Sequence, residues 1–169
     1  KINRGEFIGI IGSSGSGKTT LIDIFLGLLH PTNGKMILNG KKFNFDKGMI
    51  NDFAAYIPQD NFILDDTITT NITFNFSDDF INFPKLDKVS KKTKINEFIN
   101  NLPHKYNTKL GEHGKFLSGG QKQRIIISRS LYLQKDLLIL DESTNALDSN
   151  SKKEILEAIN DLKKNDNLT

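Results

Sequence analysis

The chain has 169 residues, the size of one compact domain, and its apolar runs are far shorter than the roughly 18 residues that cross a bilayer. Its composition of 37% hydrophobic and 25% charged residues excludes a disordered chain, and the lack of cysteine excludes disulfides and thiolate metal sites. The net charge of +3 is spread over the surface, with short lysine pairs at Lys41, Lys91 and Lys152, so we expect no nucleic-acid partner.

An apolar run at Phe7–Ile11 predicts a buried strand that leads into a glycine-rich loop. A helix is expected after the loop, and the turn residues His30–Gly34 end it. The apolar positions at helical spacing in this helix are Leu21, Ile24, Phe25 and Leu28. A strand, a glycine loop and a helix are therefore expected in that order.

Residues Lys35–Phe45 predict a β-hairpin, because Asn39-Gly40 is a sequence typical of a two-residue turn between antiparallel strands. A further short strand is predicted at Ala54–Ile57 and is closed by Pro58. Both features favour a sheet with an antiparallel portion.

The middle of the chain has helical patterns instead. One helix is predicted over Lys85–Leu102, with Pro103 ending it, and another begins at the N-cap Ser118 and runs toward Gln134. The apolar stripe of the first of these helices consists of Val89, Ile95, Phe98, Ile99 and Leu102. These two helices indicate a helical insert at about residues 60–130.

The last elements return to the first pattern. The apolar run Leu137–Leu140 predicts a buried strand, and Ser151–Glu154 is a capping box that opens a final helix. We therefore expect an α/β fold with a mostly parallel sheet, an antiparallel hairpin and an inserted helical subdomain. In this division, residues 1–59 and 131–169 form the core, and residues 60–130 form the subdomain.

The segment after the first predicted strand matches the phosphate-loop pattern of glycine, four residues, glycine, lysine and a hydroxyl residue. Its residues are Gly12, Ser13, Ser14, Gly15, Ser16, Gly17, Lys18, Thr19 and Thr20. Lys18 has the charge to bridge β- and γ-phosphates, and Thr19 has the hydroxyl that ligates Mg²⁺ in such loops. The flanking strand and helix favour this interpretation over a flexible glycine-serine turn.

Two carboxylates, Asp141 and Glu142, directly follow the strand Leu137–Leu140. Parallel sheets bind ligands at this edge, so Asp141 is expected at Mg²⁺ and Glu142 at the water that attacks the γ-phosphate. Two acids at a strand end are commonly a solvated turn or a helix cap. The phosphate loop favours the catalytic interpretation.

Between these motifs lies Leu117-Ser-Gly-Gly-Gln121, and the three motifs together resemble the ATP-binding cassette family over essentially the whole chain. The resemblance implies a phosphate-loop ATPase that uses ATP and Mg²⁺. It also implies that two domains pack head to tail. The segment Leu117–Gln121, which corresponds to the family's signature sequence, would then close over the ATP bound by the other domain. The implied ligands are Leu117, Ser118, Gly119, Gly120 and Gln121. A capped helix start without a ligand is the alternative.

The resemblance extends to single positions. Gln59 is similar to the family's glutamine that touches Mg²⁺ and the attacking water, which makes it a second catalytic candidate beside Glu142. The stretch Asn145–Asp148 resembles the family's loop at the dimer interface, although Asn145 stands where the family usually has serine.

Two segments resemble exporter-type members of the family: Asp66–Ile72 and Gly111–Gly114. A third segment, Phe98–Pro103, is similar to lipid, oligosaccharide and peptide exporters. This implies the motor domain of an exporter at the cytoplasmic face of the cell membrane. A transmembrane domain, fused in the same chain, is the implied partner.

Two parts of the family pattern are missing: an adenine-stacking aromatic before the phosphate loop and a switch histidine beyond Lys164. With the start at Lys1, this predicts a cassette truncated at both ends, with weak or no ATPase activity by itself. A soluble cassette ATPase that acts on ribosomes is the main alternative. A phosphate-loop kinase would leave Leu117–Gln121 and Gln59 unexplained.

Overall fold

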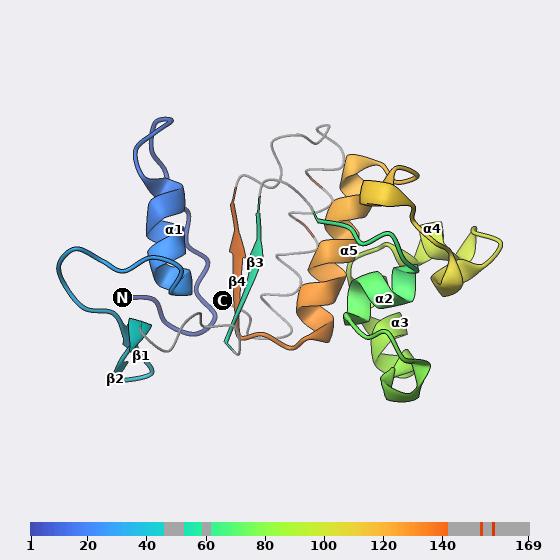
Figure 1. Ribbon diagram of the computed structural model, residues 1–169, viewed down its shortest axis with the longest axis horizontal. Coiled ribbons are helices and arrows are strands. Elements are labelled where there is room, and N and C mark those ends of the chain that lie inside the picture. The colour runs from blue at the N-terminus through green and yellow to red at the C-terminus, as the bar shows by residue number, and fades with distance from the viewer. Residues whose placement is uncertain (46–52, 59–61, 142–152, 154–156, 158–169) are drawn as a thin grey trace.

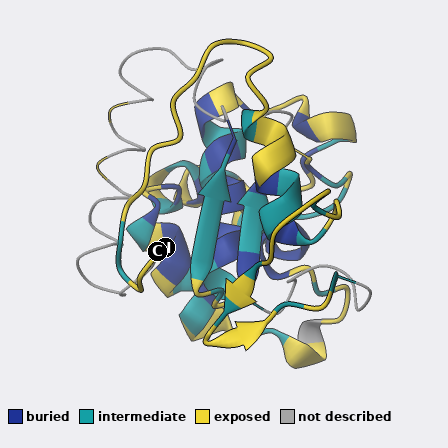
Figure 2. Ribbon diagram, turned by 90° about the vertical axis from the view of Figure 1, so that its left-hand side faces the viewer, coloured by how far each residue is buried: buried dark blue, intermediate teal, exposed yellow. Residues whose placement is uncertain are grey.

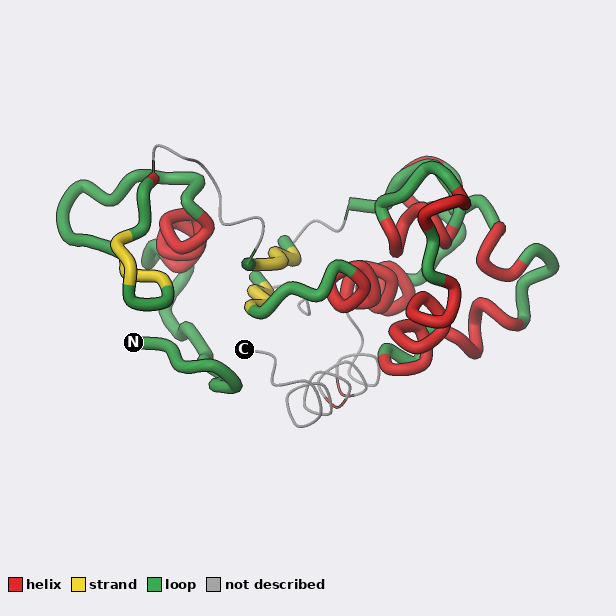
Figure 3. Tube along the Cα trace, turned by 90° about the horizontal axis from the view of Figure 1, so that it is seen from below, coloured by secondary structure: helices red, strands yellow, loops and turns green. Residues whose placement is uncertain are grey.

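The computed structural model describes residues 1–45, 53–58, 62–141, 153 and 157. Two strands at its centre, β3 (Ala54–Ile57) and β4 (Leu137–Leu140), pair in parallel. On one side of them lies α1 (Lys18–Leu26), and on the other lies α5 (Gly119–Tyr132), as Figure 1 shows. Figure 3 shows the same three layers from below. The fold is α/β, as predicted.

The side chains of β3 and β4 alternate between the two sides of this sheet. Ala54, Tyr56 and Ile139 belong to the apolar cluster on the α1 side, whereas Ile57 and Leu140 belong to the cluster on the α5 side. Figure 2, viewed from the α1 side, shows both strands in front of the helical layer; β4 is half-buried along its length, and β3 is buried at its two ends. Of the three apolar runs predicted as strands, Ala54–Ile57 and Leu137–Leu140 are therefore confirmed, although Leu137–Leu140 is half-buried and not buried.

The predicted hairpin is also confirmed. Strand β1 (Ile37–Leu38) pairs antiparallel with β2 (Lys41–Lys42). Asn39 and Gly40 connect them with φ angles of 49° and 78°. Positive φ at both central residues is the geometry that matches the twist of a two-residue hairpin, and asparagine and glycine tolerate it best.

The described chain between β3 and β4 folds into helices packed as one layer. Its helices are α2 (Ile68–Thr73), α3 (Phe83–Lys92), α4 (Asn96–Asn100) and α5, with the 3₁₀ turns η2 (Asp78–Phe80), η3 (Lys105–Asn107) and η4 (Glu112–Gly114). A single cluster of buried aliphatic side chains, most of them isoleucine, forms the core of this layer. Within the described ranges, no helix combines the length and the apolar character needed to cross a bilayer.

The helix predicted over Lys85–Leu102 is in fact two helices, α3 and α4. The chain reverses at Lys94, whose φ is 57°, and the Thr93 hydroxyl bonds back to the Val89 carbonyl oxygen at 3.2 Å. That hydroxyl also lies 2.7 Å from Ser128 Oγ, which ties the break to α5. The members of the predicted stripe that are buried are Val89, Ile95 and Ile99. The apolar face was therefore correct, and the continuity of the helix was wrong.

Residues Phe7–Ile11, predicted as a buried strand, form no strand in the structure. Ile11 is 97% exposed, and Phe7 is 56% exposed. In the described part of the chain, β3 and β4 pair with each other and not with this segment. A strand requires hydrogen bonds from a neighbouring strand, and an apolar run alone does not supply them.

Helix α1 also departs from the prediction in its buried face. Ile22 and Leu26 are buried, whereas Leu21 and Leu28, two of the four predicted core positions, are more than two-fifths exposed. The helix ends at Gly27, whose φ of 73° gives a left-handed C-cap, before the turn residues 30–34. Of the final helix expected to open at Ser151–Glu154, the structure describes Lys153 and Glu157 alone, and both are helical.

Candidate phosphate-binding site

The glycines of the loop before α1 are required by its backbone. Gly15 and Gly17 have φ angles of 75° and 88°, a region in which other residues are strained. A Cβ atom at Gly12 would collide with the side chain of Ser16. The loop therefore folds tightly where a phosphate-binding loop needs its backbone to approach a ligand closely.

The start of α1 differs from the starts of α2, α3 and α5. Those three helices are capped by side-chain oxygens of Thr67, Asn82 and Ser118, whereas the N-cap of α1 is Gly17, which has no side chain to accept a hydrogen bond. The first N–H groups of a helix carry a partial positive charge, and a start without a side-chain cap leaves them available to an anion. The start of α4, with Ile95 as its N-cap, also has no side-chain cap, but it does not follow a glycine-rich loop. The predicted loop thus ends in a helix start suited to phosphate.

Lys18 is folded back across the loop. Its Nζ donates to the carbonyl oxygens of Gly12 at 3.1 Å and of Ser13 at 3.0 Å. These two bonds hold the ammonium group at the loop, where it can exchange carbonyl contacts for phosphate oxygens. The role predicted for Lys18 at the phosphates stays a prediction.

Thr19 connects the loop to the second motif. Its Oγ1 donates to Oδ2 of Asp141 at 3.1 Å, across 122 residues of sequence. The Asp141 carboxylate is buried, and its backbone N–H donates to the Ile57 carbonyl oxygen at 3.0 Å. The structure therefore brings together Thr19 and Asp141, the two expected magnesium residues that it describes, at the carboxyl end of the sheet.

Tyr56 was not predicted as a site residue. Its hydroxyl donates to the same Asp141 Oδ2 at 3.2 Å, and burial together with the Asp141 charge raises the pKa of Tyr56 to about 12. The phenol therefore remains a donor at neutral pH. Register explains the contact, because Tyr56 lies opposite Ile139 and Asp141 is two residues further along the same face.

The Thr19 hydroxyl and the Asp141 carboxylate fit a magnesium site. Both groups are hard oxygen donors, and Mg²⁺ is usually held by one or two protein groups plus phosphate oxygens and water. The described residues contain no group of three or more histidine, cysteine, aspartate or glutamate side chains that could hold a metal alone. A cation at this site would thus depend on nucleotide phosphates for its remaining ligands.

The signature segment forms the start of α5. Ser118 Oγ accepts from the Gln121 backbone N–H at 3.3 Å, and the Gln121 side chain accepts from the Ser118 N–H at 2.9 Å. Leu117 and Gly120 are buried, whereas Ser118 and Gly119 are exposed. The helix start predicted at Ser118 is confirmed as a reciprocal capping box.

The structure does not bring the signature and the phosphate loop of one chain together. Helix α1 packs on one side of the β3–β4 sheet and α5 packs on the other (Figure 1). Because α5 runs down to the start of β4 and α1 begins beside Asp141, both helix starts lie at the carboxyl end of the strands. The start of α1 and the start of α5 therefore share one end of the described structure but do not form one site.

Three other predicted positions cannot be placed. Gln59, Glu142 and the segment Asn145–Asp148 lie outside the described residues. Asp141 and Pro58, their described neighbours in sequence, are both at the carboxyl end of the sheet.

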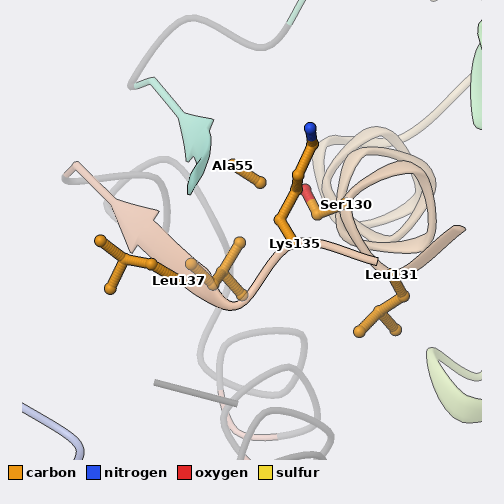
Figure 4. A pocket seen from close by; sticks show the side chains of 6 residues that line it. Ala55, Ser130, Leu131, Lys135 and Leu137 are labelled. Atoms are coloured by element: carbon orange, nitrogen blue, oxygen red, sulfur yellow. The ribbon is translucent and has the colours of Figure 1, made fainter. Parts of the chain in front are cut away.

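A hollow between the strands and α5 is unrelated to the phosphate loop. Figure 4 shows it lined by Ala55, Ser130, Leu131, Lys135 and Leu137, and Leu138 completes the lining. These residues lie near the start of β4 and the end of α5, away from Asp141 at the end of β4. The space has no room for a water molecule, so it offers no ligand site.

Comparisons with known proteins show which proteins this chain resembles. An export ATP-binding/permease protein of Rickettsia prowazekii is 42% identical over 167 residues, which is 97% of this chain and 28% of the relative. An ATP-dependent lipid A-core flippase of Cupriavidus pinatubonensis is 34% identical over 94% of this chain and 27% of the flippase. The solved structure of a bacterial Atm1-family ABC exporter with ATP bound has a TM-score of 0.81 and 31% identity, over 95% of this chain and 28% of the exporter.

The chain thus spans little more than a quarter of the length of these relatives. A sequence model described as ABC transporter matches residues 1–145, which include the loop, the signature and Asp141 with Glu142. The chain belongs to the ABC transporter family.

Proposed function

We propose that this domain binds MgATP at residues 12–20 and hydrolyses it as part of the full protein. The observation that carries the proposal is the helix start of α1, which has no side-chain cap and is joined by Thr19 to Asp141. In this assignment the backbone N–H groups of the loop and the Lys18 ammonium bind the phosphates. Thr19 and Asp141, with Gln59, hold Mg²⁺, which when bound would neutralise phosphate charge.

Hydrolysis requires a group that takes a proton from water. We assign Glu142 to that step and Gln59 to orienting the water. Glu142 directly follows Asp141, whose place at the carboxyl end of β4 supports a position near the phosphates. Closure of the site against bulk water would strengthen each of these interactions.

We further propose that two copies pack head to tail, with Leu117–Gln121 of one copy closing over the ATP of the other. The capping box uses the Ser118 and Gln121 side chains locally, and within the described chain no group accepts from the N–H groups of Gly119 and Gly120. Helices α1 and α5 lie on opposite sides of the sheet, so these N–H groups do not face the phosphate loop of their own chain. In the proposed arrangement, ATP bound by a second copy accepts from them.

The larger protein is proposed to be an exporter in which this domain works at the cytoplasmic face of a membrane. Relatives named for export and for flipping lipid A support it, and none of those named above is a ribosomal factor. Phe76 and Phe80 in the helical layer are 75% and 76% exposed, which suits a surface covered by a transmembrane domain. Residues 60–130 would then form the coupling subdomain, between the core segments 1–59 and 131–169.

The test is Glu142→Gln in the full protein, with Glu97→Gln, an exposed change on α4, as the matched control. ATP affinity should stay within about twofold in both variants. Turnover should fall at least about a hundredfold in Glu142→Gln alone, because a lost general base typically costs that much. Parental turnover in Glu142→Gln would contradict the assignment.

A further inference from the structure

The oxygen Oδ2 of Asp141 accepts two hydrogen bonds from two different elements. Thr19 at the start of α1 donates to it at 3.1 Å, and Tyr56 in β3 donates to it at 3.2 Å. Among the described residues, no other side chain donates to this carboxylate. Three elements that are distant in sequence therefore meet at one atom.

The position of that atom decides where the Thr19 hydroxyl points. A hydroxyl has one proton and two lone pairs. While the Thr19 proton is directed at Asp141, its lone pairs remain available to a cation. A carboxylate held by a single hydroxyl can rotate, and the direction of the Thr19 proton would rotate with it.

The surroundings of Tyr56 keep its hydroxyl in place. Its ring belongs to the apolar cluster on the α1 side, with Ala54 and Ile139 as neighbours. The Asp141 backbone is fixed to the same strand, since its N–H donates to the Ile57 carbonyl oxygen at 3.0 Å. Tyr56 and Asp141 are thus fixed relative to each other by β-sheet pairing, and the phenol can serve as a rigid second donor.

We propose that Tyr56 is a positioning residue for the magnesium site, because its hydroxyl fixes the Asp141 carboxylate and thereby turns the lone pairs of Thr19 toward the cation. The inference rests on the proposed function, since it assigns Tyr56 to the same site. Tyr56 touches neither the metal nor the nucleotide in this account. Groups that orient metal ligands in this way typically contribute about 10–100-fold to metal affinity.

The test is Tyr56→Phe in the full protein, with Tyr106→Phe as the matched control. Both changes remove one phenol oxygen from a half-buried ring, and Tyr106 lies in the helical layer. Electron paramagnetic resonance titration gives the affinity of the ATP-loaded protein for Mn²⁺, and calorimetry in a chelator gives the affinity for metal-free ATP. Tyr56→Phe should weaken Mn²⁺ binding about tenfold and leave metal-free ATP binding within about twofold. Tyr106→Phe should change neither.

Thr19→Ala separates this inference from the proposed function. If Thr19→Ala weakens Mn²⁺ binding and Tyr56→Phe does not, Tyr56 has no positioning role and the site assignment stands. If the parent takes up no Mn²⁺ with ATP, both the inference and the proposed site are overturned. Equal losses of Mn²⁺ and metal-free ATP affinity in Tyr56→Phe would show general damage to the fold and also overturn the inference.

Discussion

In the part of the chain that the structure describes, the two sides of the β3–β4 sheet are packed very differently. On the α5 side, 13 buried aliphatic residues of this part form one cluster, whereas on the α1 side the corresponding cluster has three: Ile22, Leu26 and Ala54. The α5 side also contains buried polar contacts, such as that between Thr93 and Ser128. The residues with the proposed chemistry, Lys18 and Thr19, lie on the less densely packed side.

This difference indicates that different interactions stabilise the phosphate loop and the helical layer of the same domain. Hydrogen bonds and glycine backbone geometry fix the phosphate loop, and apolar burial fixes the helical layer. A ligand that binds the native loop would therefore add stability on the side of the sheet where the described residues form the smaller apolar cluster. Pairs of variants, one on each side of the sheet, can measure how much each side contributes to the free energy of unfolding.

The largest difference should come from truncating one isoleucine on each side. Ile125→Ala should lower the free energy of unfolding by about 4 kcal/mol, and Ile22→Ala by about 2 kcal/mol, because a sparsely packed site collapses around the cavity more easily. Both side chains are at least 95% buried. Urea unfolding of the two variants gives the values. Equal losses would show that the sides do not differ in packing.

A smaller effect is expected from the buried guanidinium of Arg129. Its Nε donates to the Asn71 carbonyl oxygen at 2.7 Å, its two terminal nitrogens donate to the Phe62 carbonyl oxygen at 3.2 Å, and burial lowers its pKa to about 10. Arg129→Met leaves those carbonyls without donors and should cost about 2–3 kcal/mol in urea unfolding. Arg124→Met, five residues earlier on α5 and less buried, should cost under about 1 kcal/mol. A similar loss of unfolding free energy in both variants would show that the buried hydrogen bonds of Arg129 add no stability beyond that of an exposed arginine.

The smallest effect concerns the caps at the two helix starts. Ser118→Ala removes the side-chain cap of α5 and should cost about 1 kcal/mol without ligand, in thermal or urea unfolding. At the start of α1 no side-chain cap exists to remove, so stability there should instead rise when ATP is added. An ATP-free Ser118→Ala chain as stable as the parent would indicate that the capping box contributes nothing.

Elements that local sequence determines were predictable. The turn at Asn39-Gly40 and the cap at Ser118 each depend on neighbouring residues, and both formed as expected. The break at Lys94 was not predicted, since it depends on Ser128, a residue 35 positions away from Thr93. The prediction of a strand at Phe7–Ile11 was wrong for the same reason, because an apolar run does not specify which strand it pairs with.

The site shows the same division between local and distant information. The loop and Asp141 were predictable as motifs, and the hydrogen bond from Thr19 to Asp141 joins the two residues that were both expected at Mg²⁺. The contact of Tyr56 with Asp141 required the register of β3 against β4, which no single segment encodes. The roles of Gln59 and Glu142 remain predictions.

The central claim is that the α1 side of the sheet binds nucleotide through Lys18. Calorimetric titration of MgATP into the full protein tests it most directly, with Lys88→Ala on the exposed surface of α3 as the control. Lys18→Ala should weaken MgATP binding about 10–100-fold, the loss of a charge-assisted hydrogen bond of about 1.5–3 kcal/mol. Lys88→Ala should leave affinity unchanged. Unchanged MgATP affinity in Lys18→Ala would contradict the account.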